Sequence, residues 1–488
     1  AIHRVFDTGR DRLVFDVGHQ CYAHKILTGR NQAMETLRTF GGIAGFPKPV
    51  ESESDAFVAG HASNSVSVAI GMARARTLQH QDYQVLALIG DGALTGGLAY
   101  EGLNNAGASH EHLIVIVNDN GMSIDPNVGA LPRHLAQLRA KPAYYHFKKW
   151  YRRLFGANPV QSPIYRFNHR LKTELKKALW PSSTLFEDMG FTYLGPIDGH
   201  DLPRLCDMLQ WAKELTGPVV VHVHTKKGKG YPFAERNPGK FHGIAPFDPQ
   251  TGLTLQPGGE TFSSTFGKTL TDCAAESEKV CAITAAMEDG TGLAVFAKAY
   301  PERLFDVGIA EGHAVSMAAG MAKQGMRPVF AVYSSFLQRG YDMLIHDVSL
   351  DGLHVVFGID RAGLVGADGE THHGCFDALY LPQVPGMTVY CPANFAELRR
   401  MLRRALYETD GPVAVRYPRG GEGAYYTGCG SDALADCLRE GTDCTVLSYG
   451  VLVNHALEAA RRLEAEGISV RVVKLNRIAP LDGGEIAE

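Results

Sequence analysis

Cysteine is scarce and scattered in this chain of 488 residues, which has nine cysteines and no Cys-x-x-Cys pair. That pattern argues against structural zinc, and an odd count in so long a chain argues against a disulfide scaffold. Uninterrupted apolar runs stay well short of the roughly 20 residues that a membrane-spanning helix needs, and the first residues do not resemble a secretion signal. The sequence therefore predicts a cytoplasmic protein with free thiols.

An excess of one charge is also lacking. The formal net charge is −4 and 20% of the residues are charged, so the chain as a whole is not drawn to nucleic acid. The exception is segment 139–177, which holds eleven Lys or Arg and one acid, with aromatic residues interleaved. A nucleic-acid or membrane surface is one interpretation of it. We favour a mobile connection inside the first domain, because loops of this length are usually functional or disordered.

Both ends of the chain read as interrupted. The chain begins at Ala1, in a short run that resembles the last turn of a helix, and stops at Glu488, soon after a predicted helix start at Asp482. Because a helix of so few residues is marginal alone, we expect a fragment that lacks N-terminal and C-terminal portions.

Short β-branched runs that alternate with helical periods are abundant. Apolar strands separated by helices are typical of mostly parallel sheets covered by helices on both faces, and therefore of an α/β protein. The predicted strands are residues 85–89, 113–117, 219–223, 328–332, 354–359, 413–417, 444–448 and 470–473.

Two stretches without periodicity divide the chain into predicted domains. Residues 241–262 are rich in Pro, Gly and Thr, and residues 421–443 are rich in Gly. The last part of the chain holds too few predicted elements for a core of its own, so we expect only part of a third α/β domain there. The expected domains are 1–240, 263–420 and the partial domain 444–488.

The strongest motif is Gly-Asp-Gly-Ala over residues 90–93, at the end of a predicted strand, followed by Asn-Asp-Asn over 118–120 at the end of another. Asp91 offers a carboxylate oxygen and Asn120 an amide oxygen, and Mg²⁺ prefers such ligands. The glycine and alanine after Asp91 let backbone N–H groups approach a phosphate at a helix start. A lone Gly-Asp-Gly is as often a tight turn, but the pair at this spacing resembles the recognised signature of thiamine diphosphate sites.

Further stretches carry a more specific resemblance. They are Asp-Val-Gly-His-Gln (16–20), Gly-His-Ala-Ser (60–63), Thr-Lys-Lys-Gly-Lys-Gly-Tyr (225–231), Ile-Ala-Glu-Gly-His (309–313), Tyr-Ser-Ser-Phe-Leu-Gln-Arg (333–339), Asp-Arg-Ala-Gly-Leu-Val-Gly-Ala-Asp-Gly-Glu-Thr-His (360–372) and Arg-Tyr-Pro-Arg-Gly (416–420). With them the whole chain resembles the 1-deoxy-D-xylulose 5-phosphate synthases, thiamine diphosphate-dependent enzymes of the transketolase-like superfamily.

The resemblance implies a role for each member of a set of site residues. The implied metal ligands are Asp91, Asn120 and, through its backbone carbonyl, Met122. The implied contacts of thiamine diphosphate are His19, Gly60, His61, Ala62, Gly92, Ala93, Asn120, Tyr231, Glu311 and Phe336. The implied catalytic residues are Glu311, which hydrogen-bonds the aminopyrimidine ring, with His19, His242 and His372. The implied ligands of the substrate phosphate are Tyr333, Arg361, Asp368 and Arg419.

Taken singly, these residues also have ordinary structural explanations. Glu311 suits the start of a helix, Phe336 suits a packed core, and an isolated arginine suits a surface ion pair. Two arginines that each follow an apolar strand favour phosphate, because guanidinium forks match phosphate oxygens. Histidines exchange protons with substrate oxygens near neutral pH.

The resemblance implies a transferase that condenses pyruvate with D-glyceraldehyde 3-phosphate, with loss of carbon dioxide, to give 1-deoxy-D-xylulose 5-phosphate. That reaction begins the non-mevalonate isoprenoid pathway and feeds thiamine and pyridoxal synthesis. A homodimer with Mg²⁺, and no nucleic-acid or membrane partner, is expected. Ketol transfer of the transketolase type stays open, although residues 360–363 argue against it. A non-catalytic fragment that only binds cofactor stays open as well.

Overall fold

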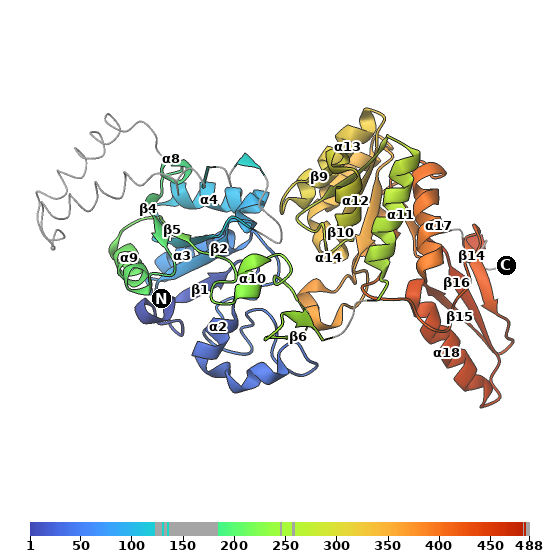
Figure 1. Cartoon of the computed structure of the whole chain (residues 1–488), viewed down its shortest axis with the longest axis horizontal. Coiled ribbons are helices and arrows are strands. Elements are labelled where there is room, and N and C mark those ends of the chain that lie inside the picture. The colour runs from blue at the N-terminus through green and yellow to red at the C-terminus, as the bar shows by residue number, and fades with distance from the viewer. Residues whose placement is uncertain are drawn as a thin grey trace, which may run out of the picture. The chain divides into compact units, whose positions relative to one another are not determined.

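The computed structural model describes residues 1–122, 129–130, 134–135, 184–244, 246–255, 259–481 and 483–484. Segment 139–177 and the predicted helix start at Asp482 therefore lie outside the described residues. The chain forms two compact units (Figure 1). The first unit is Ala1–Leu37 with Gly41–His242, and the second unit is Arg38–Phe40 with Gly243–Glu488.

The first unit is built on a five-stranded parallel sheet in the order β1-β2-β3-β5-β4. Its middle strands are near-continuous apolar runs, as burial on both faces of a parallel sheet requires. The strands are β1 (Arg12–Phe15), β2 (Val85–Gly90), β3 (Ile114–Asp119), β4 (Thr192–Asp198) and β5 (Val219–His224).

Helices pack against this sheet (Figure 1). The apolar sides of α1 and α9 join a core cluster with Leu86, Ile114 and Val219, and α3 packs against β1, β2 and α4. The helices are α1 (Ile2–Val5), α2 (Tyr22–Lys25), α3 (Ser65–Leu78), α4 (Gly97–Ser109), α8 (Leu185–Asp188), α9 (Leu202–Glu214) and α10 (Pro232–Arg236). Over the described residues of both units, every helix falls short of the length and apolar content that crossing a membrane requires.

The second unit is built on a seven-stranded sheet in the order β17-β12-β13-β11-β10-β8-β9, parallel except for β17. Val329 and Phe330 are neighbours on β10 and belong to different core clusters, so both faces of this sheet are covered. The strands are β8 (Val280–Thr284), β9 (Leu304–Asp306), β10 (Arg327–Tyr333), β11 (Val356–Asp360), β12 (Thr388–Tyr390), β13 (Val413–Arg416) and β17 (Arg477–Ala479).

Two sets of helices form these layers (Figure 1). Helices α11, α12 and α17 pack with Val329, and α13 packs with Phe330. The helices are α11 (Phe262–Glu276), α12 (Ala294–Ala299), α13 (Glu311–Lys323), α14 (Ser334–Leu337), α15 (Tyr341–Met343), α16 (Asp377–Tyr380) and α17 (Phe395–Tyr407).

The end of the chain adds a three-stranded sheet in the order β14-β16-β15, with α18 (Val453–Glu464) packed against it. Its strands are β14 (Ala435–Arg439), β15 (Cys444–Tyr449) and β16 (Val470–Leu475). Strand β17 follows β16 and joins the seven-stranded sheet, so the two sheets belong to one unit.

All the predicted strands are present, and the predicted α/β class is confirmed. The stretches predicted to lack strands nevertheless contain short ones. Strand β14 lies within 421–443, and the short hairpin of β6 (Phe247–Asp248) and β7 (Leu253–Thr254) lies within 241–262. Strand β14 is an edge strand of half-exposed residues, so it has no continuous apolar run for the sequence to reveal.

A buried ion pair fastens the three-stranded sheet to α17. Lys474 Nζ on β16 lies 2.8 Å from Glu397 Oε1, and both side chains are fully buried. The Tyr426 hydroxyl donates to the same oxygen over 2.7 Å, and the Ala393 N–H donates to Oε2 over 2.8 Å. Because a buried charge needs such partners, this cluster holds the end of the chain on the second unit.

We expect Glu397→Ala to lower the free energy of unfolding of the second unit by about 3–5 kcal/mol. The reason is that the buried Lys474 ammonium keeps a carboxylate only at Asp436, 3.9 Å away. Glu276→Ala is the matched control, because Glu276 and Arg403 pair at 2.7 Å with both side chains nearly half exposed. It should cost about 0–1 kcal/mol. Equal denaturant midpoints for the two variants would contradict this account.

Candidate functional site

The carboxyl ends of β1, β2, β3 and β5 meet at one edge of the first sheet, and polar residues follow each strand. Asp16 follows β1, Asp91 follows β2, Asn118 and Asp119 end β3, and Thr225 follows β5. The Thr225 hydroxyl donates to Asn118 Oδ1 over 2.8 Å, which links the ends of β3 and β5. Ligands of parallel sheets bind at such an edge.

Two carboxylates lie buried side by side at this edge. The N–H of Gly121 donates to Asp91 Oδ2 over 2.7 Å and to Asp119 Oδ1 over 3.2 Å. Burial, and then the negative charge of Asp119, raise the pKa of Asp91 to about 7. A divalent cation bound here would relieve the repulsion between the carboxylates, so the pair suits a cation.

The predicted metal ligands Asp91, Asn120 and Met122 come together in the turn after β3. Asn120 Oδ1 accepts the N–H of Met122 over 3.0 Å, and Asp91 holds the intervening Gly121. Among the described residues, three or more His, Cys, Asp or Glu side chains never gather as a metal cluster. A cation at this turn would therefore draw on amide, backbone and ligand oxygens as well.

The predicted loop Gly60, His61 and Ala62 is tied to the same edge through Ser63. The Ser63 hydroxyl donates to the carbonyl oxygen of Ala93 over 2.8 Å. Asp16 accepts the N–H groups of Ser63 and Ser65 over 2.7 and 3.0 Å, which fixes the start of α3. Gly92 and Ala93 begin a short turn before α4, and their predicted contact with a phosphate stays a prediction.

The predicted histidines His19 and His242 are also together, with ring centroids 4.8 Å apart. Lys227 Nζ lies 2.9 Å from His242 Nδ1, and burial and then the Lys227 charge lower the pKa of His242 to about 4. Because the ammonium can only donate, Nδ1 accepts and the ring proton of neutral His242 resides on Nε2. Tyr231 is near this pair through its edge contact with Phe241.

The second sheet has an equivalent edge, where the predicted phosphate ligands meet. The Arg361 guanidinium lies 3.7 Å from the centroid of the Tyr333 ring and donates to the Gly290 carbonyl over 2.8 Å. Arg419 donates to Asp368 over 2.6 Å. Burial and the charge of Asp368 raise the pKa of the Tyr333 hydroxyl, and the charge of Arg419 lowers it. Two guanidinium groups and a hydroxyl at a strand edge are donors of the kind that a phosphate accepts from. Each guanidinium also has a carboxylate partner here, Asp360 for Arg361 at 3.1 Å and Asp368 for Arg419.

Phe336 joins this cluster to His372. Its ring centroid lies 5.5 Å from that of Tyr333 and 5.5 Å from that of His372. Glu311 is the first residue of α13, buried to 4% exposure, with Arg339 at 3.7 Å. Burial raises the pKa of the Glu311 carboxyl, with Arg339 opposing, so the buried acid favours its protonated form more than an exposed one does.

Sequence reasoning missed Asp119, His222, Lys227 and Asp360. Asp119 and Lys227 stood inside motifs, yet neither received a role. His222 interrupts an apolar strand, Val-Val-Val-His-Val, and that buried histidine was a usable signal. Asp360 opens the motif at 360–372 but also received no role; it is fully buried at the end of β11 and accepts a hydrogen bond from Ser263 over 2.6 Å.

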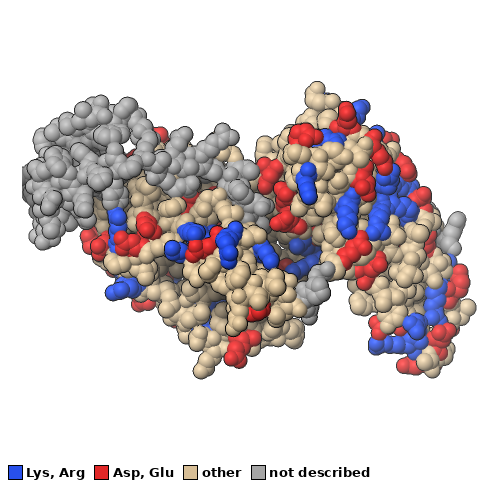
Figure 2. Space-filling view, viewed as in Figure 1, with Lys and Arg blue, Asp and Glu red and all other residues tan. Residues whose placement is uncertain are grey.

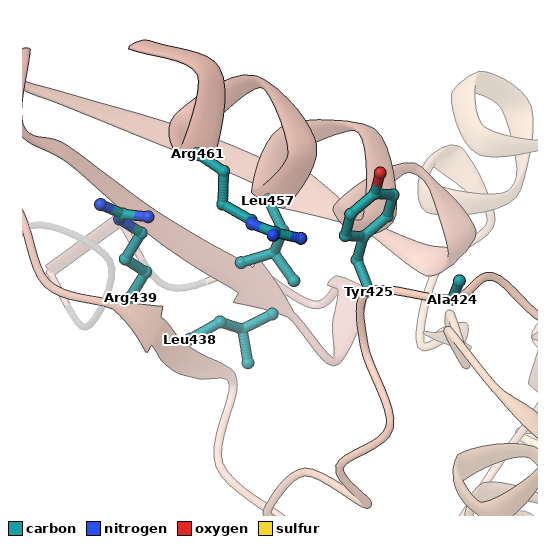
Figure 3. Close-up of a pocket in the computed structure, with 6 residues that line it drawn as sticks. All are labelled: Ala424, Tyr425, Leu438, Arg439, Leu457 and Arg461. Carbon is teal, nitrogen blue, oxygen red and sulfur yellow. The ribbon is translucent and has the colours of Figure 1, made fainter. Parts of the chain in front are cut away.

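A separate hollow lies beside α18 (Figure 3). It is lined by Ala424, Tyr425, Leu438, Arg439, Leu457 and Arg461. Arg461 lies over the Tyr425 ring at 5.5 Å, and Arg439 pairs with Glu464 at 2.8 Å. None of the predicted site residues lines it, so it is not part of the candidate site.

Basic side chains on the second unit stand among acidic ones (Figure 2). The arginines of α17 have carboxylate partners, for example Arg399 with Glu260 at 3.0 Å and Arg403 with Glu276 at 2.7 Å. These carboxylate partners offset part of the positive charge of α17.

Comparison with known proteins identifies related families over most of the chain. The family model described as 1-deoxy-D-xylulose-5-phosphate synthase matches residues 1–225. The transketolase pyrimidine-binding and C-terminal domain models match residues 260–421 and 433–488. A 1-deoxy-D-xylulose-5-phosphate synthase of Carboxydothermus hydrogenoformans is 52% identical over 99% of this chain and 78% of its own length. One of Clostridium kluyveri is 50% identical over 99% of this chain and 77% of its own.

We expect Lys227→Met to raise the pKa of His242 from about 4 while leaving it below 6.5, because burial, the larger cause, remains. NMR of histidine labelled with ¹³C at Cε1, assigned with His242→Gln, measures it. Because the pKa of His242 is lower in the folded than in the unfolded protein, the unfolded state binds this proton first. The free energy of unfolding therefore falls as pH falls below about 6.5, and the variant should lose less of it. Lys226→Met is the control, because Lys226 pairs with Glu235 instead. An unchanged or lower pKa in Lys227→Met would refute the contact.

Proposed function

This chain belongs to the 1-deoxy-D-xylulose-5-phosphate synthase family, and we propose that it condenses pyruvate with D-glyceraldehyde 3-phosphate. Carbon dioxide is lost and 1-deoxy-D-xylulose 5-phosphate is formed. The observation that carries the proposal is identity of about half the residues with named synthases along 99% of the chain. The two sheet edges agree with it, since one suits a cation and the other suits a phosphate.

The cofactors are thiamine diphosphate and Mg²⁺, and the residues at the first edge fit them. Bound thiamine diphosphate supplies the electron sink for decarboxylation. Asp91, Asn120 and the Met122 carbonyl would hold the cation, which the buried pair of carboxylates favours. The implied contacts of the organic cofactor are His19, Gly60, His61, Ala62, Gly92, Ala93, Asn120, Tyr231, Glu311 and Phe336.

Glu311 would hold a proton toward the aminopyrimidine ring. Its burial at the first residue of α13 favours a protonated carboxyl, which can donate a hydrogen bond to a ring nitrogen. Arg339, 3.7 Å away, limits how far the charged form is disfavoured. Phe336 offers a ring face for stacking.

The histidines would serve the oxygens of the substrates. Neutral His242 can donate from Nε2 at neutral pH, because Lys227 occupies Nδ1. His19 lies against the His242 ring, so the two can act on one group. His372 lies edge-on to Phe336 and would serve substrate oxygens on the second unit.

The phosphate of the aldehyde substrate would bind Tyr333, Arg361, Asp368 and Arg419. Arg361 is held by the Tyr333 ring below it and the Gly290 carbonyl at its end. Arg419 is nearly half exposed and can turn from Asp368 toward an anion. A phosphate attracts both guanidinium groups more strongly than a neutral aldehyde does.

The finer features of the proposal concern the whole protein. We infer a homodimer in the cytoplasm, acting at the first step of the non-mevalonate isoprenoid pathway and feeding thiamine and pyridoxal synthesis. The domains would be 1–240 for diphosphate and metal, 263–420 for the pyrimidine and 444–488 as part of a third. Both curated relatives described above are named as synthases, which disfavours ketol transfer.

The direct test is product formation by the purified chain. With pyruvate, D-glyceraldehyde 3-phosphate, thiamine diphosphate and Mg²⁺, we expect mass spectrometry to find deoxyxylulose phosphate and released carbon dioxide. Glu311→Ala should bind Mg²⁺ and the diphosphate through Asp91 and Asn120 yet form no product, which separates binding from catalysis. Turnover of ketose donors without pyruvate consumption would favour a transketolase. Cofactor binding without any product would favour a non-catalytic fragment.

Arg419→Ala tests the phosphate subsite. We expect KM for D-glyceraldehyde 3-phosphate to rise by about 10- to 100-fold, because a hydrogen bond between charged groups contributes about 1.5–3 kcal/mol. KM for pyruvate should change little. Arg399→Ala, which removes a surface arginine paired with Glu260, is the control. Equal increases for both substrates would remove Arg419 from the phosphate site.

A further inference from the structure

A chain of hydrogen-bonded polar side chains crosses three neighbouring strands of the first sheet. The Tyr193 hydroxyl on β4 lies 2.7 Å from Nδ1 of His222 on β5. Nε2 of the same imidazole lies 2.9 Å from Asp119 Oδ2 on β3. Tyr193, His222 and Asp119 are 6%, 0% and 0% exposed, so these hydrogen bonds are buried away from water.

The chain ends at the turn that carries the proposed metal ligands. Asp119 Oδ1 accepts the N–H of Gly121 over 3.2 Å, and the same N–H donates to Asp91 over 2.7 Å. Gly121 has a φ of +77°, which glycine adopts readily and other residues rarely do. The Gly121 peptide is therefore held from two sides, by the Asp91 carboxylate and, over the longer distance, by the Asp119 carboxylate.

The hydrogen-bonded side chains take positions in the sheet that apolar side chains could otherwise fill. His222 stands where its neighbours on β5 are valines, and an apolar side chain would fit without buried polar atoms. Gly195 lies against it, because a Cβ there would be 2.6 Å from the His222 carbonyl oxygen and 2.9 Å from its Cβ. Strand β4 shifts register between Leu194 and Ile197 at the same place.

We propose that Tyr193, His222 and Asp119 are positioning residues for the cation–diphosphate turn at residues 120–122. Tyr193 fixes the imidazole, the imidazole fixes the Asp119 carboxylate, and Asp119 fixes the Gly121 peptide between Asn120 and Met122. This inference rests on the proposed function, since it takes that turn to be the metal site. Groups that orient metal ligands in this way typically contribute about 10- to 100-fold to metal affinity.

Mn²⁺ binding to the whole chain in the presence of thiamine diphosphate tests the inference, with free Mn²⁺ followed by electron paramagnetic resonance. We expect His222→Asn to weaken Mn²⁺ binding by about 10- to 100-fold. His222→Gln should recover most of the affinity, because its amide nitrogen reaches the position of Nε2 and can donate to Asp119. Tyr193→Phe should weaken binding less, since it leaves the His222–Asp119 bond in place.

Tyr426→Phe is the matched control, because it removes a similar buried hydroxyl, 2.7 Å from Glu397 in the second unit. It should lower thermal stability as Tyr193→Phe does, but leave Mn²⁺ affinity unchanged. If His222→Asn and His222→Gln both fold and bind Mn²⁺ as the unaltered protein does, the hydrogen bonds of Tyr193, His222 and Asp119 have only a structural role. The inference is then wrong. If the unaltered chain itself binds no Mn²⁺ with thiamine diphosphate, the proposed function fails first and the inference falls with it. Should His222→Asn not fold, Tyr193→Phe still decides: weaker Mn²⁺ binding than in Tyr426→Phe supports the inference, and equal binding contradicts it.

Discussion

The parallel pairing of strands is the constraint on which the candidate site depends. The carboxyl ends of parallel strands all lie at one edge of the sheet. Backbone N–H and C=O groups there lack partners within the sheet, so side chains must form hydrogen bonds with them. In the first unit Asp16, Asp91 and Asp119 do so by accepting backbone N–H groups. In the second unit, Asp360 accepts from Ser263 and Arg361 donates to the Gly290 carbonyl. The groups that close each sheet are thus among the candidate site residues or their direct partners.

Some of the backbone strain lies close to these edges, while other strained residues, such as His80 and His110, lie beyond the ends of helices. Val17, Ser63, Ala286 and Arg361 have positive φ angles of 56°, 73°, 58° and 60°. Such conformations typically cost about 1–3 kcal/mol each and persist where the surroundings hold them. Val17 follows β1 and Arg361 follows β11, so the strain turns the chain where it leaves the sheet. Buried polar groups and strained turns at one edge are the usual signature of a functional site rather than of a core.

The sequence predicted the apolar central strands well and the marginal ones poorly. Strands β2, β3 and β5 are continuous apolar runs, and each was found within a residue or two. Strand β4 contains Gly195 and Pro196, which normally argue against a strand. Strand β14 is held by antiparallel pairing to β16 rather than by its own pattern. Tertiary pairing decides such strands, so no local period could reveal them.

The difference between local pattern and tertiary pairing also explains which site residues the sequence could predict. Motifs named the candidate site residues, because many of those residues follow strands at readable positions. His222 and Asp119 are 103 residues apart, and only the fold brings them together; Lys227 and His242 are 15 residues apart, joined by a loop whose path no local pattern predicts. Some members of the predicted set, such as His61, Ala62 and Tyr231, are placed at the first edge, while their roles toward a cofactor stay predictions.

The Asn-Asp-Asn motif shows how one short stretch serves both the sheet and the site. Successive residues of a strand point to opposite faces, so the three side chains cannot share one task. Asn118 accepts a hydrogen bond from Thr225, Asp119 reaches His222 in the interior, and Asn120 caps the turn through Met122. The sequence assigned chemistry to Asn120 alone. Because Asp119 holds the turn from the interior while Asp91 holds it from the proposed metal site, the position of Asn120 depends on the packing of the sheet as well as on the site. The motif is therefore part of the fold as much as of the candidate site.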